Sequence, residues 1–319
     1  MHVMADQDRG PAQIVLTASV ARRYYLDGRS KVEIAEEFGM SRFKVARLLD
    51  DARETGLVRI EIRHPGEIDV DLSARLRDRY GLQHAVVIDV PDDDAASLRG
   101  HVGRAAARLL AEIITPQDVL GLAWARAVSA MARALPALPG TPVVQLSGAL
   151  SMPEGPDTSV DVVREVARRS GGAAHLFYAP LTLPDAATAR ALRQQPEVAR
   201  AFDQLPSVTK AVAGVGLWEA GQSTLYDTAT DDDRRELREL GVCADISGVF
   251  VAGDGTPVPT ELAERMIALN AAQMRAIPEL VVVPYGTRKA PAVRAALRSG
   301  LVSGIVTHST LARAVLDEL

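Results

Sequence analysis

One segment near the N-terminus combines basic side chains with an aromatic ring. Within residues 41–49 stand Arg42, Lys44 and Arg47 with no acidic residue, although the whole chain has a formal net charge of −5. Basic groups bind phosphates, a guanidinium pairs with the edge of guanine, and a ring such as that of Phe43 can contact a thymine methyl. Because DNA affinity depends on where charge lies and not on its sum, this segment predicts contact with double-stranded DNA.

Three helices are expected to position these side chains. The first covers residues 12–26, and the second begins at Ser30, with Glu33 completing a capping box. Gly39 then supplies a sharp turn before a third helix over residues 41–54. Two capped helices joined by a turn that contains glycine are typical of a helix-turn-helix, which makes the third helix the recognition helix.

The third helix has one apolar face. At about 100° per residue, that face is formed by Val45, Leu48, Leu49 and Ala52. Phe43 and Arg47 point the other way, so we predict that Arg47 binds guanine and Phe43 a thymine methyl. The alternatives are that Phe43 packs within the head and that Arg47 contacts only phosphate. The predicted DNA-binding residues are Ser41, Arg42, Phe43, Lys44 and Arg47.

The pattern changes after the head. Residues 57–62 alternate with a period of two, which predicts a short strand, half of a wing. His64-Pro65-Gly66 ends it, so we expect a DNA-binding domain over 1–65 and a second domain over 66–319. In the second domain a helix over 67–80 precedes alternating strands and helices. Strands are expected at 85–90, 118–123, 142–146, 174–177, 211–215, 280–283 and 304–307. Such apolar runs are typical of a parallel α/β sheet.

Glycine and small polar residues follow several of these strands. They occur in residues 120–129, 145–150, 213–218 and 284–289. Open α/β sheets bind ligands at the carboxyl ends of their strands, where helix N-termini favour anions. The sequence therefore predicts a small polar or phosphorylated ligand.

The composition argues against other classes of protein. Cys243 is the one cysteine, which excludes an intrachain disulfide framework and any metal site built from several cysteines. We expect no metal and no cofactor. The chain has no apolar run of about 18 residues, and its start lacks the pattern of a signal peptide, so we expect a cytoplasmic protein with no membrane partner.

The whole chain resembles the SorC family of bacterial sugar-responsive transcriptional regulators. In the head the matching stretch is YYLDGRSKVEIAEEFGMSRFKVARLLDDARETGLVRIEI, residues 24–62. In the second domain the strongest stretches include YAPLTLPD (178–185) and GVCADISGVFVAGDGTPV (241–258). The resemblance implies a Rossmann-like α/β effector domain, related in fold to sugar-phosphate isomerases, that senses a sugar, polyol or sugar phosphate. It also implies operator DNA as a partner and a homodimer or homotetramer.

The resemblance also implies effector-binding residues. The family's first ligand loop has Trp-Gly and then a hydroxyl residue; here Trp124 matches, but Ala125 replaces the glycine and Ala127 the hydroxyl residue. The two alanines prevent a phosphate from coming close to the backbone and remove a hydroxyl donor. Arg126 could still supply a positive charge, and the first turn of the following helix could supply backbone amides. These departures from the family pattern argue against a sugar phosphate and less against a free sugar or polyol.

Five further effector-binding residues come from the same resemblance. Asp245 is expected to accept hydrogen bonds from sugar hydroxyls, and Lys289 to neutralise an anionic group. Arg265 is expected to shape the site, with Gln145 and Gly216 as strand-end candidates. The alternatives are a capping or turn role for Asp245, a solvated side chain for Lys289 and a structural ion pair for Arg265.

Two other functions remain open. An enzyme of the sugar-phosphate isomerase or deaminase type with an added head would need a positioned acid–base pair, and no motif places one. An architectural DNA binder would not need so large a second domain. We therefore predict an allosteric regulator, in which the effector binds two arrangements of the protein with different affinity.

Overall fold

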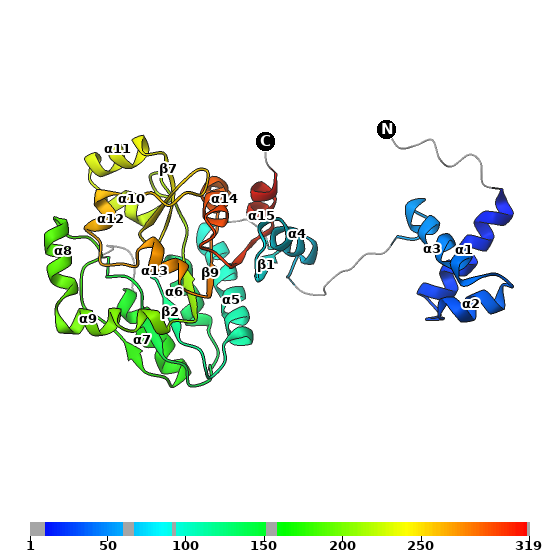
Figure 1. The fold of residues 1–319 in the computed structure, drawn as a ribbon, viewed down its shortest axis with the longest axis horizontal. Coiled ribbons are helices and arrows are strands. Elements are labelled where there is room, and N and C mark those ends of the chain that lie inside the picture. The colour runs from blue at the N-terminus through cyan, green and yellow to red at the C-terminus, as the bar shows by residue number, and fades with distance from the viewer. Residues whose placement is uncertain (1–9, 60–66, 91–93, 151–157, 318–319) are drawn as a thin grey trace. The chain divides into compact units, whose positions relative to one another are not determined.

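The chain divides into two units, and each is described separately. In the computed structural model, residues 10–59, 67–90, 94–150 and 158–317 are described. The units are Met1–Arg63, called the head below, and His64–Leu319, called the body (Figure 1).

Capping interactions define the helices of the head. The helices are α1 (Pro11–Tyr25), α2 (Lys31–Glu37) and α3 (Arg42–Glu54). The predicted capping box is present, because Ser30 Oγ accepts from the Glu33 amide at 3.3 Å and Glu33 Oε2 accepts from the Ser30 amide at 2.8 Å. Gly39 makes the turn with a φ of 60°, a conformation that favours glycine. Ser41 Oγ caps α3 by accepting from the Lys44 amide at 3.2 Å.

The apolar face of α3 forms the core of the head, as predicted. Val45, Leu48, Leu49 and Ala52 are buried together with Val20 of α1 and Ile34 of α2. The predicted wing strand is not seen over 57–59, where the backbone is irregular. Val58 instead packs against this core, and its amide donates to Ala52 O at 2.8 Å. Residues 60–62 of the predicted strand lie outside the described residues.

The body contains the predicted parallel sheet. Its seven strands have the order β1-β10-β9-β5-β2-β3-β4, and each strand pairs in parallel with its neighbours. The strands are β1 (His84–Ile88), β2 (Leu120–Leu122), β3 (Val143–Gln145), β4 (Ala174–His175), β5 (Lys210–Ala213), β9 (Glu279–Val282) and β10 (Gly304–His308). Each of the seven strands expected from the sequence is present.

A second, smaller sheet was not expected. It has the order β6-β7-β8 and is antiparallel, with β6 (Gly216–Leu217), β7 (Val242–Ile246) and β8 (Val249–Ala252). The prediction of a purely parallel body was therefore incomplete. An apolar run does not by itself show whether its neighbour runs parallel or antiparallel, and here the Ser247-Gly248 turn reverses the chain between β7 and β8.

Helices cover both faces of the large sheet. One face packs against α4 (Val70–Tyr80), α14 (Ala290–Arg298) and α15 (Ser309–Leu316), and the other against α5 (Ala95–Ile113), α6 (Arg126–Ala134) and α7 (Ser159–Ser170). The predicted helix over 67–80 begins only at Val70, because Ile68 pairs with Ile88 and Asp69 caps the helix. The other helices are α8 (Ala186–Arg193), α9 (Pro196–Phe202), α10 (Thr224–Thr228), α11 (Asp231–Glu239), α12 (Glu261–Glu264) and α13 (Ala271–Arg275), with 3-10 turns η1 (Leu205–Ser207) and η2 (Thr287–Lys289).

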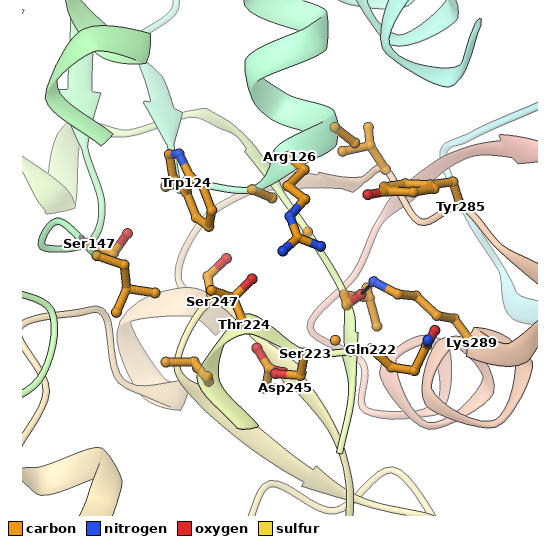
Figure 2. A pocket seen from close by; sticks show the side chains of 18 of the residues that line it. Trp124, Arg126, Ser147, Gln222, Ser223, Thr224, Asp245, Ser247, Tyr285 and Lys289 are labelled. Atoms are coloured by element: carbon orange, nitrogen blue, oxygen red, sulfur yellow. Dashed lines mark hydrogen bonds between the residues drawn. The ribbon is translucent and has the colours of Figure 1, made fainter. Parts of the chain in front are cut away.

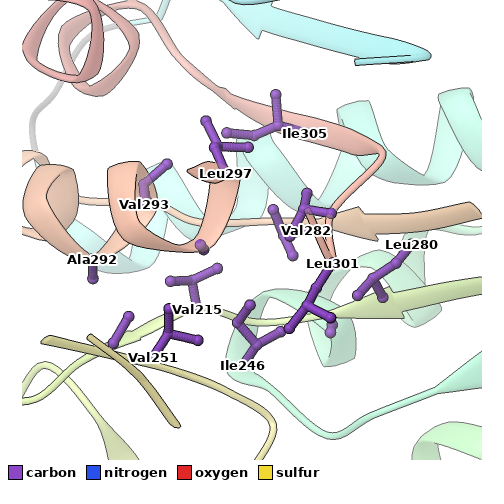
Figure 3. Packing of buried hydrophobic residues seen from close by; sticks show 14 of the residues in the cluster. Val215, Ile246, Val251, Leu280, Val282, Ala292, Val293, Leu297, Leu301 and Ile305 are labelled. Carbon is purple, nitrogen blue, oxygen red and sulfur yellow. The ribbon is translucent and has the colours of Figure 1, made fainter. Parts of the chain in front are cut away.

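Helix α14 joins the two sheets through one apolar core. Figure 3 shows Val293 and Leu297 of this helix with side chains of both sheets around them. The large sheet contributes Val282 and Ile305, and the small sheet contributes Ile246 and Val251. The shared core fixes the small sheet against the carboxyl ends of β5 and β9.

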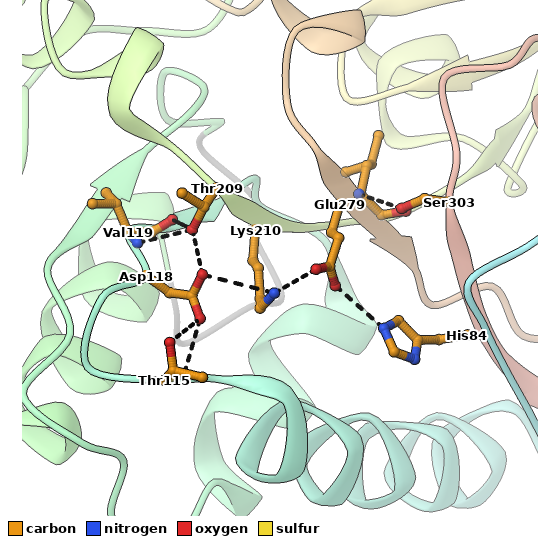
Figure 4. A network of polar contacts seen from close by, with 9 residues as sticks. His84, Thr115, Asp118, Val119, Thr209, Lys210, Glu279 and Ser303 are labelled. Carbon is orange, nitrogen blue, oxygen red and sulfur yellow. Dashed lines mark hydrogen bonds and ion pairs between the residues drawn. The ribbon is translucent and has the colours of Figure 1, made fainter.

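A polar network ties together the amino ends of four strands (Figure 4). Lys210 Nζ pairs with Glu279 and lies 3.7 Å from Asp118 Oδ1, and His84 Nε2 is 3.2 Å from Glu279 Oε2. Burial alone would raise the pKa of Asp118, but hydrogen bonds from Thr209 and Thr115 outweigh it and lower that pKa. The network lies at the end of the sheet opposite to the carboxyl ends of the strands.

Candidate functional site

A cavity of about 210 Å³ lies where the large sheet meets the small one. Its walls come from the loops that follow β2, β5 and β9, and from β6, β7 and α10 (Figure 2). The three loops follow the carboxyl ends of parallel strands, the edge at which open α/β sheets bind ligands. The predicted residues that line this cavity are Trp124, Ala125, Arg126, Gly216, Asp245 and Lys289.

Asp245 places a buried carboxylate in the wall of the cavity. Its Oδ2 accepts a 2.6 Å hydrogen bond from Ser223 Oγ. Burial raises the pKa of Asp245, while Ser223 and the charge of Lys289 oppose that rise. Oδ1 accepts no hydrogen bond from the residues that the structure describes, so it can accept one from a ligand hydroxyl.

Gly216 makes room for this carboxylate. A Cβ at position 216 would lie 2.0 Å from Asp245 Oδ2, a distance that no real side chain tolerates. The position of Gly216 thus has a steric reason, while its contact with an effector stays a prediction. Any larger residue there would displace Asp245.

Lys289 supplies a cation opposite Asp245. Its Nζ donates to Val215 O at 2.8 Å and lies 5.5 Å from the centre of the Tyr285 ring. Burial lowers the pKa of Lys289, while the charge of Asp245 opposes the change and Arg126 adds to it. The alternative of a freely solvated lysine is therefore wrong. An ammonium group has three donors, which leaves two for a ligand.

The loop before α6 offers amides and a guanidinium. Ala125 is the N-cap of α6 and provides no side-chain hydrogen bond to the first turn. In Figure 2 the guanidinium of Arg126 reaches into the cavity between Trp124 and Tyr285. The methyl of Ala125 points towards Gly214, where an added Cβ would lie 2.6 Å from it. Uncapped amides and a cation together suit an anionic or strongly polar ligand group.

The cavity also contains polar residues that sequence reasoning missed. They are Ser147, Gln222, Ser223, Thr224 and Ser247. Ser247 has a φ of 51°, the one positive value among the non-glycine residues that are described, and Gly248 follows with 101°. Positive φ at both central positions is the pattern of a type I′ hairpin turn. The Oγ of Ser247 is buried and has no hydrogen-bond partner within the described part of the chain. A Ser-Gly pair between two apolar runs was the signal that could have revealed this turn.

Gln145 does not reach the cavity. Its Nε2 donates to Ser147 O at 2.9 Å and Ser159 Oγ at 3.2 Å, and its Oε1 accepts from the Phe177 amide at 3.2 Å. With 1% of its surface exposed, it has no group left for a ligand. Its expected role as an effector contact is corrected to that of holding the Ser147 loop.

Arg265 also lies outside the cavity. Its guanidinium pairs with Asp233, whose carboxylate also accepts from Thr230 in the capping box of α11. The structural ion pair, which the sequence left open as an alternative, therefore replaces the expected effector role. The spacing within residues 264–278 gave no information on which way this side chain points.

The predicted DNA-binding residues share the exposed side of α3. Arg42, Lys44 and Arg47 are exposed, and Phe43 exposes 72% of its surface. The guanidinium of Arg42 lies 4.9 Å from the centre of the Phe43 ring. Packing of Phe43 within the head, the alternative to DNA contact, does not occur. A basic face around one exposed ring is the arrangement expected of a helix that enters the major groove.

Comparison with known proteins identifies the family. Residues 64–317 match the Sugar-bind family model, described as "Putative sugar-binding domain". The chain belongs to this family. The Sugar-bind match spans nearly all of the body, including every element that lines the cavity.

Relatives of this Sugar-bind protein match along most of its length. It is 29% identical over 304 residues to the uncharacterized transcriptional regulator YjhU of Escherichia coli K12, covering 92% of each chain. It is 29% identical over 310 residues to the transcriptional regulator LsrR of Klebsiella pneumoniae, covering 96% of this chain and 94% of LsrR.

A solved structure shows the same fold. The full-length sorbitol operon regulator SorC from Klebsiella pneumoniae matches with a TM-score of 0.74 at 23% identity, covering 95% of this chain and 99% of SorC. The resemblance to the SorC family and the α/β fold with a helix-turn-helix head are confirmed.

Proposed function

We propose that this protein is a DNA-binding transcriptional regulator whose operator affinity is controlled by a small carbohydrate in the cavity of the body. The observation that carries the proposal is the pairing, in one chain, of an exposed basic recognition helix with a polar cavity at the strand ends of a Sugar-bind domain. Relatives named as transcriptional regulators support it.

The polar groups of the cavity indicate a carbohydrate. Asp245 Oδ1, Gln222 and the hydroxyls of Thr224 and Ser247 can bind ligand hydroxyls, while the ring of Trp124 offers an apolar surface. The body would recognise a free sugar or polyol through these groups. Arg126 and Lys289 would add affinity for a phosphorylated form.

Sensing and not catalysis is proposed for this cavity. The predicted mechanism requires the bound carbohydrate to prefer one of two arrangements of a homodimer or homotetramer. The paired heads would then lose or gain the spacing that matches two operator half-sites. The operator is expected to have two-fold symmetry.

The experiment couples ligand binding to DNA binding in the full chain. Sugars, polyols and their phosphates are screened by thermal shift, and each ligand found is added to a gel-shift assay on duplexes selected from a random library. Asp245→Asn should weaken ligand binding by roughly ten- to a hundredfold, because a neutral amide replaces the charged acceptor of the ligand hydroxyl. It should leave operator binding without ligand unchanged.

Asp232→Asn is the matched control, because Asp232 is exposed and paired only with Arg235 on the surface of α11. It should behave as the wild type in both assays. A ligand that binds but leaves operator affinity unaltered, or that binds the Asp245→Asn variant equally well, would contradict the proposal.

A further inference from the structure

The body holds a second cavity that shares no lining residue with the first. Its volume is about 550 Å³, against about 210 Å³ for the candidate effector cavity. It is bounded by the end of α8, the start of β8, the loop over 257–260, α12 and the segment that leads into α13. Figure 1 shows α8 and α12 as neighbours at the edge of the body.

The walls of this second cavity are mainly apolar. Side chains of Val249, Phe250, Val258, Met266 and Leu269 line it. A concave apolar surface with few polar groups is the usual form of a small-molecule site, since the apolar wall provides affinity and the polar groups fix orientation. Helix α8 provides the main polar group of this cavity.

That group is the guanidinium of Arg193. Its Nη2 donates to Met266 O at 2.6 Å and Ala268 O at 3.2 Å, and the group lies 5.5 Å from the centre of the Phe202 ring. These contacts fix the orientation of the guanidinium. Both acceptors are neutral carbonyl oxygens, so within the described residues the charge of this guanidinium has no paired carboxylate.

The remaining nitrogens of Arg193 lack acceptors. Within the described part of the chain, Nε is buried with no hydrogen-bond partner, and Nη1 donates to no atom. Burial lowers the pKa of Arg193, and no carboxylate among the described residues acts against that change. A half-buried cation without an anion is costly, so an anionic group that binds Nη1 would be stabilised there.

The rim adds to the positive charge. Arg190 lies three residues before Arg193 on α8, and therefore on the same side of the helix, and it also lines the cavity. Among the described residues that line the cavity, Glu264 is the one acidic residue. Two guanidinium groups and one carboxylate favour an anion over a cation as the occupant.

We propose that this cavity is a second ligand site, which binds a small carboxylate with an apolar body. The carboxylate would accept from Arg193 Nη1, and the apolar body would pack against Phe250 and Met266. The site is separate from the carbohydrate cavity, whose polar lining suits a different chemistry.

The proposal is tested with octanoate and 1-octanol, which have the same chain length and differ in charge. Binding to the full-length protein is measured by isothermal titration calorimetry. Octanoate should bind at least about tenfold more tightly than 1-octanol, because only the carboxylate can form a charge-assisted hydrogen bond. Equal affinity for the two would overturn the proposal.

Two variants locate the binding. Arg193→Gln should reduce octanoate affinity by about tenfold or more, while Arg235→Gln, which removes an exposed guanidinium from α11, should not change it. Ala263→Phe fills the cavity from α12 and leaves Arg193 in place, so it should abolish binding even if Arg193→Gln does not fold. Undiminished octanoate binding in Ala263→Phe would place octanoate elsewhere and refute the assignment.

Discussion

Ser247 shows how one residue in the candidate effector cavity can combine backbone strain with an unused hydrogen-bonding group. A non-glycine residue at positive φ costs about 1 kcal/mol or more, and such strain is retained where the surrounding structure requires it. Here the turn between β7 and β8 places this hydroxyl in the wall of the cavity (Figure 2), and it has no hydrogen-bond partner among the described residues. We infer that the hydroxyl contacts the ligand.

Two substitutions separate the strain of Ser247 from its hydroxyl. Ser247→Gly should relieve the strain and raise the free energy of unfolding by about 0.5–1 kcal/mol, while Ser247→Ala keeps the strain. Both remove the hydroxyl, so both should weaken ligand binding by roughly three- to tenfold. Thermal unfolding and calorimetry measure the two effects. If both variants bind the ligand as the wild type does, the hydroxyl has no role in recognition.

At the scale of elements, the recognition helix α3 is expected to distinguish one operator sequence from another. Arg47→Ala should cost about 1–3 kcal/mol on the selected operator and relax discrimination at one base position. Arg53→Ala is the matched control, since Arg53 is also exposed on α3 but pairs with Asp50 at 2.5 Å near the end of the helix. Binding is measured on operator and random duplexes. An equal loss on both would make Arg47 a phosphate contact only.

The polar network at the amino ends of the large sheet is expected to contribute to the free energy of unfolding. Asp118→Asn should lower the free energy of unfolding by about 1–3 kcal/mol at pH 7, because it weakens a buried, hydrogen-bonded network at the amino ends of β2, β5 and β9. The folded protein lowers the pKa of Asp118, so the carboxylate stabilises the fold above its unfolded pKa, near 3.9.

That stabilisation should disappear as the pH falls through the lowered, folded pKa. The difference between wild type and Asp118→Asn should therefore be full at pH 7 and shrink below about pH 4. Urea unfolding at several pH values measures it. A difference that does not change with pH would mean that the variant acts through packing and not through charge.

At the scale of the whole molecule, the two units are proposed to divide the function between them. A body that starts at His64 should keep the ligand-induced rise in melting temperature and lose operator binding, because the cavity residues lie in the body and the basic face of α3 lies in the head. Thermal shift and gel shift on the truncated chain test this. Loss of ligand stabilisation on truncation would mean that the head takes part in the ligand site.

Local patterns in the sequence determined the head and the large sheet. Ser30, Glu33, Gly39 and Ser41 define helix boundaries through contacts within three or four residues, so their roles can be read from spacing alone. The seven parallel strands were likewise marked by apolar runs. The family resemblance then pointed to Asp245 and Lys289.

Only the tertiary structure decided which side chains meet. Gln145 and Arg265 were predicted to contact the effector. In the structure Gln145 donates a hydrogen bond to Ser159 and Arg265 pairs with Asp233, partners 14 and 32 residues away in the sequence. The Ser247-Gly248 pair indicates a turn, but the sequence could not show that the Ser247 hydroxyl or the Arg193 guanidinium is left without a partner, because that depends on burial, which removes the water around each group. Sequence spacing encodes local hydrogen bonds, whereas burial depends on packing between distant segments. The sequence therefore determined the helices of the head and the strands of the large sheet, and the tertiary structure decided the small sheet and the composition of both cavities.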